Sequence, residues 1–172
     1  MKTLLSITVF ILSTSNLLAQ VKKENISSKK EAISRQDNSL KKLAKQATIM
    51  SNAFVQKDYD TFLNFLHPKI LQSLGERRTI IQNLNEGFES GDKVLEIFNE
   101  QPSELIIGNK TYQCTFTQRL KMLINQKGIS INSTLIAISY NKGKDWKFVN
   151  TSGSNIEDLR DLIPELSMLL VF

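Results

Sequence analysis

Hydrophobic residues recur at steps of three and four from residue 40 onward, and this spacing predicts a helix of about 17 residues. The apolar stripe consists of Leu40, Leu43, Ala44, Ala47, Met50 and Phe54. Two shorter helices are expected to follow it. Asp58 can cap the first, and Pro68 can open the second, which Gly75 would end.

The period changes from 3.6 to 2 after residue 92, which is typical of β-strands. The clearest strand covers residues 112–124, where one face is apolar except for Gln118 and the other face is polar. We expect the polar face to be solvated. A second long strand is predicted over residues 129–140. Its apolar residues change parity, so we expect a β-bulge near Ser133 and Thr134.

The remaining segments complete an α+β pattern. Residues 76–90 have helical spacing, shorter strands are expected over residues 94–98, 104–107 and 145–151, and Ser154 with Glu157 fits a capping box that opens a last helix. This order predicts N-terminal helices packed on a curved antiparallel meander sheet, with a C-terminal helix.

The start of the chain has the pattern of a secretory signal peptide over residues 1–19. Lys2 precedes a mostly apolar run, and Ala19 is a small residue at the expected cleavage site. A membrane anchor would need roughly 20 apolar residues, more than this run holds, and no later segment is long enough. We therefore expect export to the periplasm or the extracellular space, and no transmembrane segment in the mature chain.

The formal charge of +5 is concentrated near the N-terminus. Residues 20–45 hold eight basic and three acidic residues, whereas the rest of the mature chain is close to neutral. We expect residues 20–38 to form a basic, flexible lead-in and residues 39–172 to form a single α+β domain. A nucleic-acid-binding domain would carry a basic surface with interleaved aromatic residues, so nucleic acid is not an expected partner.

Residue counts exclude several chemistries. One Cys and one His leave no intramolecular disulfide and no multi-Cys zinc site. Because Cys114 lies on the apolar face of its strand, we interpret it as a core residue rather than a nucleophile. The sequence has no phosphate-binding loop and no hydrolase or metalloprotease motif. We therefore predict no metal, no cofactor and no assigned catalytic residue.

Four polar residues near apolar faces are candidates for lining a ligand pocket: Tyr59, His67, Gln118 and Tyr140. A buried Gln118 would need hydrogen-bond partners, either a ligand or another part of the chain, and we favour the second. His67, with an ordinary pKa of about 6.5, could act as a general base. It also precedes Pro68 at a helix end, and there a capping or exposed position is the simpler interpretation.

The chain resembles the nuclear transport factor 2-like superfamily, which includes ketosteroid isomerase and SnoaL-like enzymes. The resembling features are the helix end over residues 52–59, the short helix to His67-Pro68 and the strand end over residues 144–149, within about residues 40–152. More closely, it is similar to small exported bacterial proteins of unassigned function in residues 135–139, 145–149 and 162–166. The resemblance implies a cone-shaped fold. The helices between His67 and Val94 depart from it, since many members have a hairpin there.

These observations favour an exported, non-enzymatic domain that binds a small apolar ligand or an envelope protein. Two alternatives remain open. One is a small enzyme of isomerase or hydratase type that uses Tyr and His in place of a carboxylate base. The other is a structural module of the cell envelope that forms a homodimer.

Overall fold

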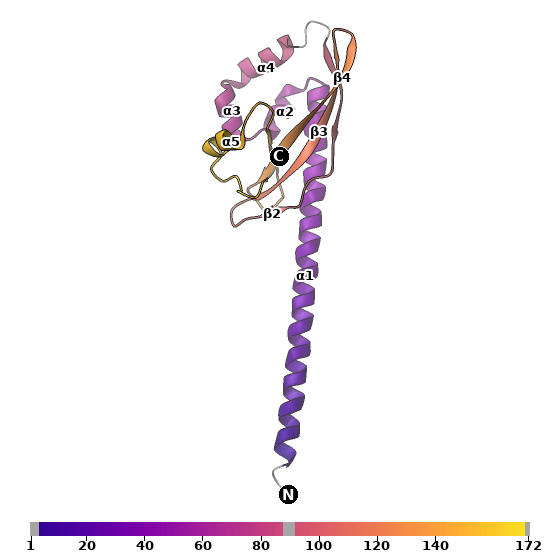
Figure 1. Ribbon diagram of the computed structural model, residues 1–172, viewed down its shortest axis with the longest axis vertical. Helices are drawn as coiled ribbons and strands as arrows, with labels where there is room; N and C mark the ends of the chain where they lie inside the picture. The colour runs from indigo at the N-terminus through magenta and orange to yellow at the C-terminus, as the bar shows by residue number, and fades with distance from the viewer. Residues whose placement is uncertain (1–3, 88–91, 171–172) are drawn as a thin grey trace. The chain divides into compact units, whose positions relative to one another are not determined.

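The computed structural model describes residues 4–87 and 92–170, with side chains from residue 29 onward. The helices are α1 (Leu4–Val55), α2 (Tyr59–Phe65), α3 (Pro68–Leu74), α4 (Arg77–Glu86) and α5 (Ile156–Leu162). The strands are β1 (Lys93–Asn99), β2 (Ile106–Ile107), β3 (Tyr112–Ile124), β4 (Lys127–Ser139) and β5 (Lys147–Asn150) (Figure 1). N-terminal helices pack on a five-stranded antiparallel sheet and a C-terminal helix follows, which confirms the predicted α+β class.

The apolar stripe predicted a helix of about 17 residues from residue 40 onward, but helix α1 begins at Leu4. It therefore includes residues 20–38, which we expected to be flexible. The chain has no Pro or Gly before Pro68, so no residue in this stretch stops a helix. Arg35 also forms an ion pair with Glu31 one turn away, at 2.6 Å. The chain divides into two compact units after Asn38. The signal peptide stays a prediction, and its first three residues lie outside the described part.

Local capping residues set the bounds of the short helices. Asp58 accepts a hydrogen bond from the backbone N–H of Thr61 at 3.1 Å, as predicted, and Gly75 ends α3 with a φ of 100°. The predicted capping box of the last helix was wrong by one residue. Asn155, rather than Ser154, is the N-cap of α5, and its side chain accepts from Asp158 N at 2.8 Å.

The sheet has the strand order β1-β3-β4-β5, and β2 pairs with the start of β3. Strands β3 and β4 form a long hairpin whose register is unbroken from Tyr112–Ser139 to Ile124–Lys127. The bulge predicted near Ser133 and Thr134 is therefore absent from this described hairpin. The only register shift among the described strand pairs lies in β1, between Val94 and Glu96.

The parity change in β4 has another cause, since apolar residues are buried on both faces of the sheet. On one face, β3, β4 and β5 pack against α1; this cluster contains Leu43, Ala47, Met50, Leu105, Cys114, Phe116, Leu135, Ala137, Trp146 and Phe148. On the other face, α5 and the segment after it cover the sheet; this cluster contains Ile136, Ile138, Val149, Leu159, Ile163, Leu166 and Leu170. Alternate residues of β4 therefore belong to different cores.

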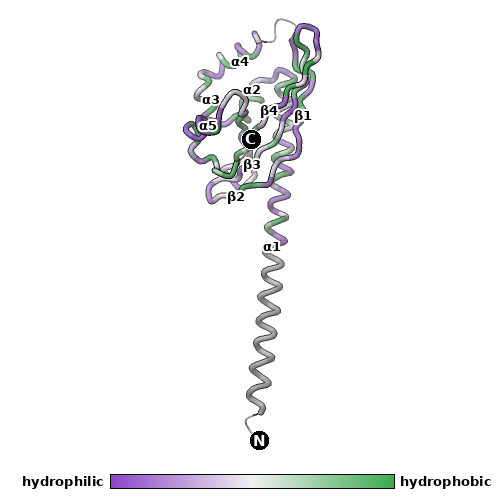
Figure 2. Tube along the Cα trace, viewed as in Figure 1, coloured by the Kyte–Doolittle hydropathy of each residue, from purple (hydrophilic) through white to green (hydrophobic). Residues whose placement is uncertain are grey.

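The second core also corrects the predicted solvated face of β3. Gln113 and Thr115 lie on that face but are only 2% and 9% exposed. The C-terminal segment hydrogen-bonds to Gln113, and Ser103 hydrogen-bonds to Thr115. Farther along the strand, Arg119 and Lys121 are exposed as expected, and hydrophobic and hydrophilic residues alternate along the hairpin (Figure 2). No helix among the described residues has the length and hydropathy that crossing a membrane requires.

Candidate functional site

Two of the four candidate residues meet in a chain of hydrogen bonds. His67, between α2 and α3, lies 2.8 Å from the hydroxyl of Tyr140, measured from Nε2, and this hydroxyl also hydrogen-bonds to the carboxylate of Glu165. These hydrogen bonds join the start of α3, the end of β4 and the segment after α5. His67 is only 2% exposed, whereas Tyr140 is 48% exposed. The structure thus links a buried imidazole to the surface through a phenol.

The backbone fixes the direction of the proton donors in this chain. His67 Nδ1 accepts the N–H of Lys69 at 3.2 Å and caps α3, so Nδ1 carries no proton there. A neutral His67 therefore carries its proton on Nε2 and donates it to the Tyr140 oxygen. The Tyr140 hydroxyl in turn donates to Glu165. Each group in the chain has a matched donor or acceptor.

The pKa directions agree with this assignment. Burial lowers the pKa of His67, and the nearby Lys147 and Lys69 lower it further, against the opposing effect of Glu165. Burial raises the pKa of Tyr140, and its hydrogen bond to Glu165 adds to the rise. The same hydrogen bond lowers the pKa of Glu165. At neutral pH the chain holds a neutral imidazole, a neutral phenol and a carboxylate.

An open groove of about 580 Å³ adjoins Glu165. Its lining comes from β2, the loop between β2 and β3, the start of β3 and the segment after α5: Ile106, Gly108, Asn109, Lys110, Thr111, Gln113, Pro164, Glu165 and Ser167. Gln113 fixes the groove wall, because it donates to Glu165 O at 2.7 Å and accepts from Ser167 N at 2.9 Å. Charged groups of both signs face this groove. Its lining surface is more apolar than polar, and the groove is open to solvent.

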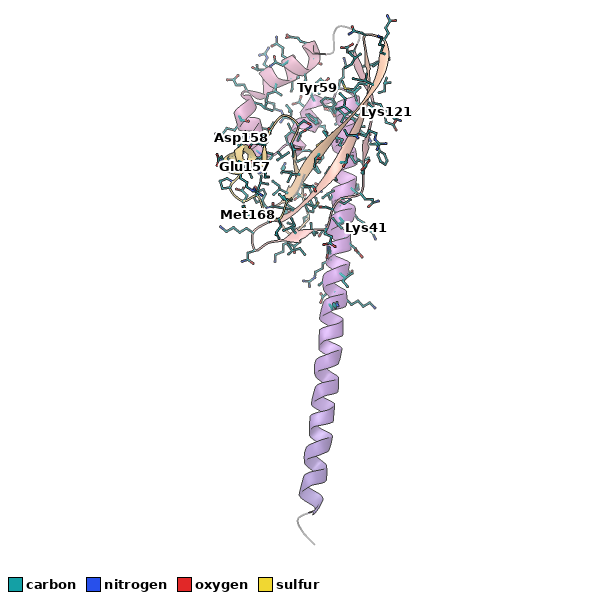
Figure 3. All side chains as sticks on the ribbon, in the orientation of Figure 1. Lys41, Tyr59, Lys121, Glu157, Asp158 and Met168 are labelled. Carbon is teal, nitrogen blue, oxygen red and sulfur yellow. The ribbon has the colours of Figure 1, made fainter. Side chains whose placement is uncertain are left out.

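The other two candidate residues lie elsewhere. Tyr59, labelled in Figure 3, is buried. Its ring lies 5.7 Å from that of Phe54 in an edge-to-face arrangement, and its hydroxyl lies 3.5 Å from Leu84 O. Burial raises the pKa of Tyr59, so this phenol stays neutral. These contacts make Tyr59 part of the packing between the end of α1, α2 and α4.

Gln118 has protein partners for its amide group, as the structural interpretation required. Its Nε2 donates to Asn99 Oδ1 at 2.9 Å and to Ser51 Oγ at 3.3 Å. Asn99 also donates to Ser51 at 3.0 Å, which closes a small network between β3, β1 and α1. The neighbouring Ser133 Oγ is buried and has no hydrogen-bond partner among the described residues. Gln118 therefore joins a helix to the sheet.

The hollows that the described part of α1 lines are small. Two hollows lined partly by α1 measure about 30 Å³ and 90 Å³. Trp146 and Phe148, which are 1% and 0% exposed, belong to the core on this side of the sheet. Cys114 is fully buried there, and burial raises the pKa of its thiol to about 12, so it is unsuited to nucleophilic chemistry. Within the described residues, no cluster of His, Cys, Asp and Glu could hold a metal ion.

The far half of the β3–β4 hairpin carries apolar side chains that no core cluster contains. We call the six residues that share one side of β1, β3 and β4 the hairpin face: Val94, Ile97, Leu120, Met122, Ile129 and Ile131. Ile129 is 37% exposed and Ile131 is 45% exposed, and none of the six is buried. Lys121, labelled in Figure 3, lies on the opposite side and pairs with Glu96 at 2.7 Å. The opposite side is mixed, because it carries Arg119 and Lys121 together with Phe98, which is 55% exposed.

Two of these features were absent from the predictions. Glu165 follows Pro164 in a segment whose pattern suggested only a helix end, so no local signal pointed to it. The hairpin face could have been found, because the alternation of Ile129 and Ile131 with polar residues was visible. The sequence analysis instead attributed the change of parity after Ile131 to a β-bulge.

Comparisons with known proteins leave the family open. No family model matches the chain, and no curated protein matches it. A solved structure described as a "2.5 Angstrom structure" from Catenulispora acidiphila aligns with a TM-score of 0.44 at 10% identity. The alignment covers 71% of this chain and 93% of that one. A likeness of this degree carries no argument about function.

Proposed function

We propose that this chain is an exported, non-enzymatic binding domain that binds another envelope protein on its hairpin face. The observation that carries the proposal is the exposure of Ile129 and Ile131 beside the half-buried Leu120 and Met122. Contiguous apolar surface of this kind on a water-soluble domain commonly marks an interaction site. On the opposite side, Lys121 and Arg119 form ion pairs with Glu96 and Glu100, so that side is more polar.

A protein partner fits the hairpin face better than a small apolar ligand fits the interior. Ligand pockets usually measure about 300–1,000 Å³ and enclose most of the ligand. The hollows of about 30 Å³ and 90 Å³ beside α1 are well below this size. The open groove beside Glu165 is large enough, but it is open to solvent and would leave much of a small ligand exposed.

We further propose the cone-shaped fold of the nuclear transport factor 2-like superfamily. Support comes from the order of elements over residues 40–152, with a long helix and short helices followed by an antiparallel sheet that packs on them. Helices α3 and α4, in the place of the usual first hairpin, distinguish this chain from many members. Export is proposed from the signal-peptide pattern of residues 1–19.

A second candidate function is acid–base catalysis at the groove. One observation favours it: Glu165 lines the groove and connects to Tyr140 and His67. The internal hydrogen bonds oppose it, because the phenol and the imidazole already have their donors and acceptors matched. A crystallographic fragment screen that places a compound against Glu165, and none on the hairpin face, would favour this candidate.

Site-specific photo-crosslinking in the native host tests the binding proposal. A photoreactive phenylalanine analogue replaces Ile129 in the full-length chain, with the same analogue at the exposed Lys142 as a control. We expect discrete adducts from position 129 and none from position 142. Introducing Ile131→Lys beside the probe should remove the adducts, because it places a charge in the middle of the apolar surface.

The outcomes separate the candidates. Adducts that persist in the Ile131→Lys variant, or that form equally from position 142, would contradict a partner bound to the hairpin face. The mass of each adduct also distinguishes a foreign partner from a second copy of this chain.

A further inference from the structure

The edge of the sheet at β5 and the edge at β1 are both protected against pairing with another strand. Beside β5, the segment before α3 forms a parallel bridge from Leu66 to Phe148, and His67 N donates to Phe148 O at 3.0 Å. The edge formed by β1 has a register shift and carries Lys93 and Glu96. Bulges, charges and covering segments are the usual protections of sheet edges.

The N-terminal half of β4 lacks these protections. Strand β5 pairs only with residues 135–138, and its continuation bonds once more, from Thr151 N to Thr134 O at 3.0 Å. Residues 127–132 are all exposed, and among the described strands none pairs with them on the side away from β3. This stretch, Lys127–Gly128–Ile129–Ser130–Ile131–Asn132, has one charged residue and no Pro. It is a template for one more strand.

The register shows which backbone groups are available. The carbonyl of Thr134 points away from β3, because it accepts from Thr151. Backbone groups alternate in direction along an antiparallel strand, and the β3–β4 register is unbroken here. Gly128, Ser130 and Asn132 therefore direct both their N–H and their C=O groups toward the open side.

We propose that this edge pairs antiparallel with the same edge of a second copy of the chain, around a two-fold axis at Ser130. Ser130 would form two hydrogen bonds with Ser130 of the partner subunit. Gly128 would form two with Asn132 of the partner subunit, and Asn132 would form two with Gly128 of the partner subunit. Every outward backbone group from residue 128 to residue 132 is then used.

The side chains of this stretch are complementary to themselves in that register. Ile129 lies opposite Ile131 of the partner subunit on the same face, which pairs apolar side chains across the axis. Lys127 lies opposite Ser133 of the partner subunit, so the two lysines stand at opposite ends of the paired segment and do not repel each other closely. An isologous two-fold contact requires this self-complementarity, whereas an unrelated strand would meet it only by chance.

The inference deepens the proposed function, on which it rests for its biological role. Joining two β4 edges would make one continuous sheet across both copies. The two hairpin faces would then form a single apolar surface, with Ile129 and Ile131 of each copy at its centre. The natural partner would bind to this surface rather than to one hairpin.

Sedimentation of the full-length chain tests the dimer. We expect a concentration-dependent dimer for the wild type and a monomer for Ser130→Pro. Proline removes an N–H that points away from β3, so the β3–β4 bonds stay intact and Pro is tolerated at this kind of position. Losing the two central bonds should raise the dimer dissociation constant by roughly 30-fold or more. Ser130→Thr keeps the N–H and should remain dimeric.

A cysteine cross-link gives a second measurement that does not depend on affinity. The Cα atoms of a hydrogen-bonded antiparallel pair lie about 5.5 Å apart, which a disulfide can span. Ser130→Cys should therefore form covalent dimers under mild oxidation, whereas Ser73→Cys, exposed on α3, should not.

Each failure has a separate meaning. A wild-type chain that is monomeric at high concentration, or a Ser130→Pro variant that folds with unchanged thermal stability and still dimerises, would overturn this inference. A monomeric wild type would leave the proposed function standing, because one hairpin face suffices for it. Adducts from position 129 that contain only a second copy of this chain, with no foreign partner, would instead contradict only the proposed function.

Discussion

The hydroxyl of Tyr140 joins three segments that are far apart along the chain, and its removal should show how much they depend on it. In Tyr140→Phe, the Nε2–H of His67 loses its acceptor while the imidazole stays buried. A buried donor left without a partner costs roughly 1–3 kcal/mol. We expect urea denaturation at pH 7.5 to show a loss of that size in the free energy of unfolding.

The matched variant is Glu165→Gln, which changes the exposed end of the same series of hydrogen bonds. The amide oxygen of Gln still accepts from Tyr140, and the lost charge lies at the surface. The free energy of unfolding should change by less than about 1 kcal/mol. A loss as large as that of Tyr140→Phe would show that the stability depends on the carboxylate of Glu165 rather than on the acceptor for the buried imidazole.

Protonation of His67 should destabilise the fold at mildly acidic pH. Because burial lowers the pKa of folded His67 below the ordinary value of 6.5, the unfolded chain binds its proton first as the pH falls. The stabilisation is complete above about pH 6.5 and is lost as the pH falls toward the folded pKa. Glu165, Lys69 and Lys147 face the imidazole, and Glu165 alone opposes the shift.

His67→Asn provides the control, because Asn can cap α3 and does not titrate. The free energy of unfolding of the wild type should fall between pH 7.5 and pH 5.5, and the variant should fall less over the same range. Equal slopes would contradict the assignment. Glu165 also has a lowered pKa, but its contribution is lost only below about pH 4.5 and lies outside this window.

The sequence singled out His67 and Tyr140 separately but gave no sign that they meet. They lie 73 positions apart, and their contact depends on how α3 packs against the end of β4. The two interpretations of Gln118 were distinguishable only by its neighbours, since Ser51 and Asn99 come from other elements. Residue type identifies a group that needs a partner, and tertiary structure selects the partner.

At the scale of elements, the two long strands were predictable and their burial was not. Alternation over residues 112–124 identified β3, but the same alternation suggested that Gln113 and Thr115 face solvent. Both are buried, Gln113 by contacts with the C-terminal segment and Thr115 beside Ser103. In β4, apolar residues such as Leu135 and Ile136 point to opposite faces of the sheet. This pattern fits a strand buried on both faces as well as it fits a strand with a bulge.

The hairpin turn between β4 and β5 shows how a single residue fixes the contact between two elements. Gly143 has a φ of 76°, and a Cβ atom there would lie 2.5 Å from Ser39 Cβ on α1. Gly143→Ala should therefore lower the free energy of unfolding by about 1–3 kcal/mol, through backbone strain and a clash with the helix. Thermal or urea denaturation measures this loss.

Gly128→Ala is the matched comparison in the other hairpin. Its Cβ would meet nothing within 4 Å, and its φ is not in the positive range. The free energy of unfolding should change by less than about 0.5 kcal/mol. If the two substitutions cost the same, the close approach of Gly143 to Ser39 would not be a constraint on the fold.

At the scale of the whole molecule, the order of helices and strands followed from local periodicity, whereas the length of α1 did not. A stretch with few apolar residues and no Pro or Gly is compatible with a flexible segment and with a solvated helix. Lys, Glu, Ser and Ala occur in both, so composition could not distinguish them over residues 20–38. The helical state of this stretch is consistent with the Glu31–Arg35 pair, which an extended chain would not form.

Export makes a prediction about which part of α1 the mature protein retains. Cleavage after Ala19 would leave Gln20 as the first residue, and intact-mass spectrometry of the exported protein should show the loss of residues 1–19. Ala19→Leu should block processing, because the cleavage site requires a small residue, whereas Ala32→Leu, at an exposed position later in α1, should have no effect. An exported protein that keeps residues 1–19, or equal processing of both variants, would contradict the signal peptide. Helix α1 does not exclude cleavage after Ala19. The same residues can form the apolar core of a signal peptide during export and the first turns of α1 in the uncleaved chain.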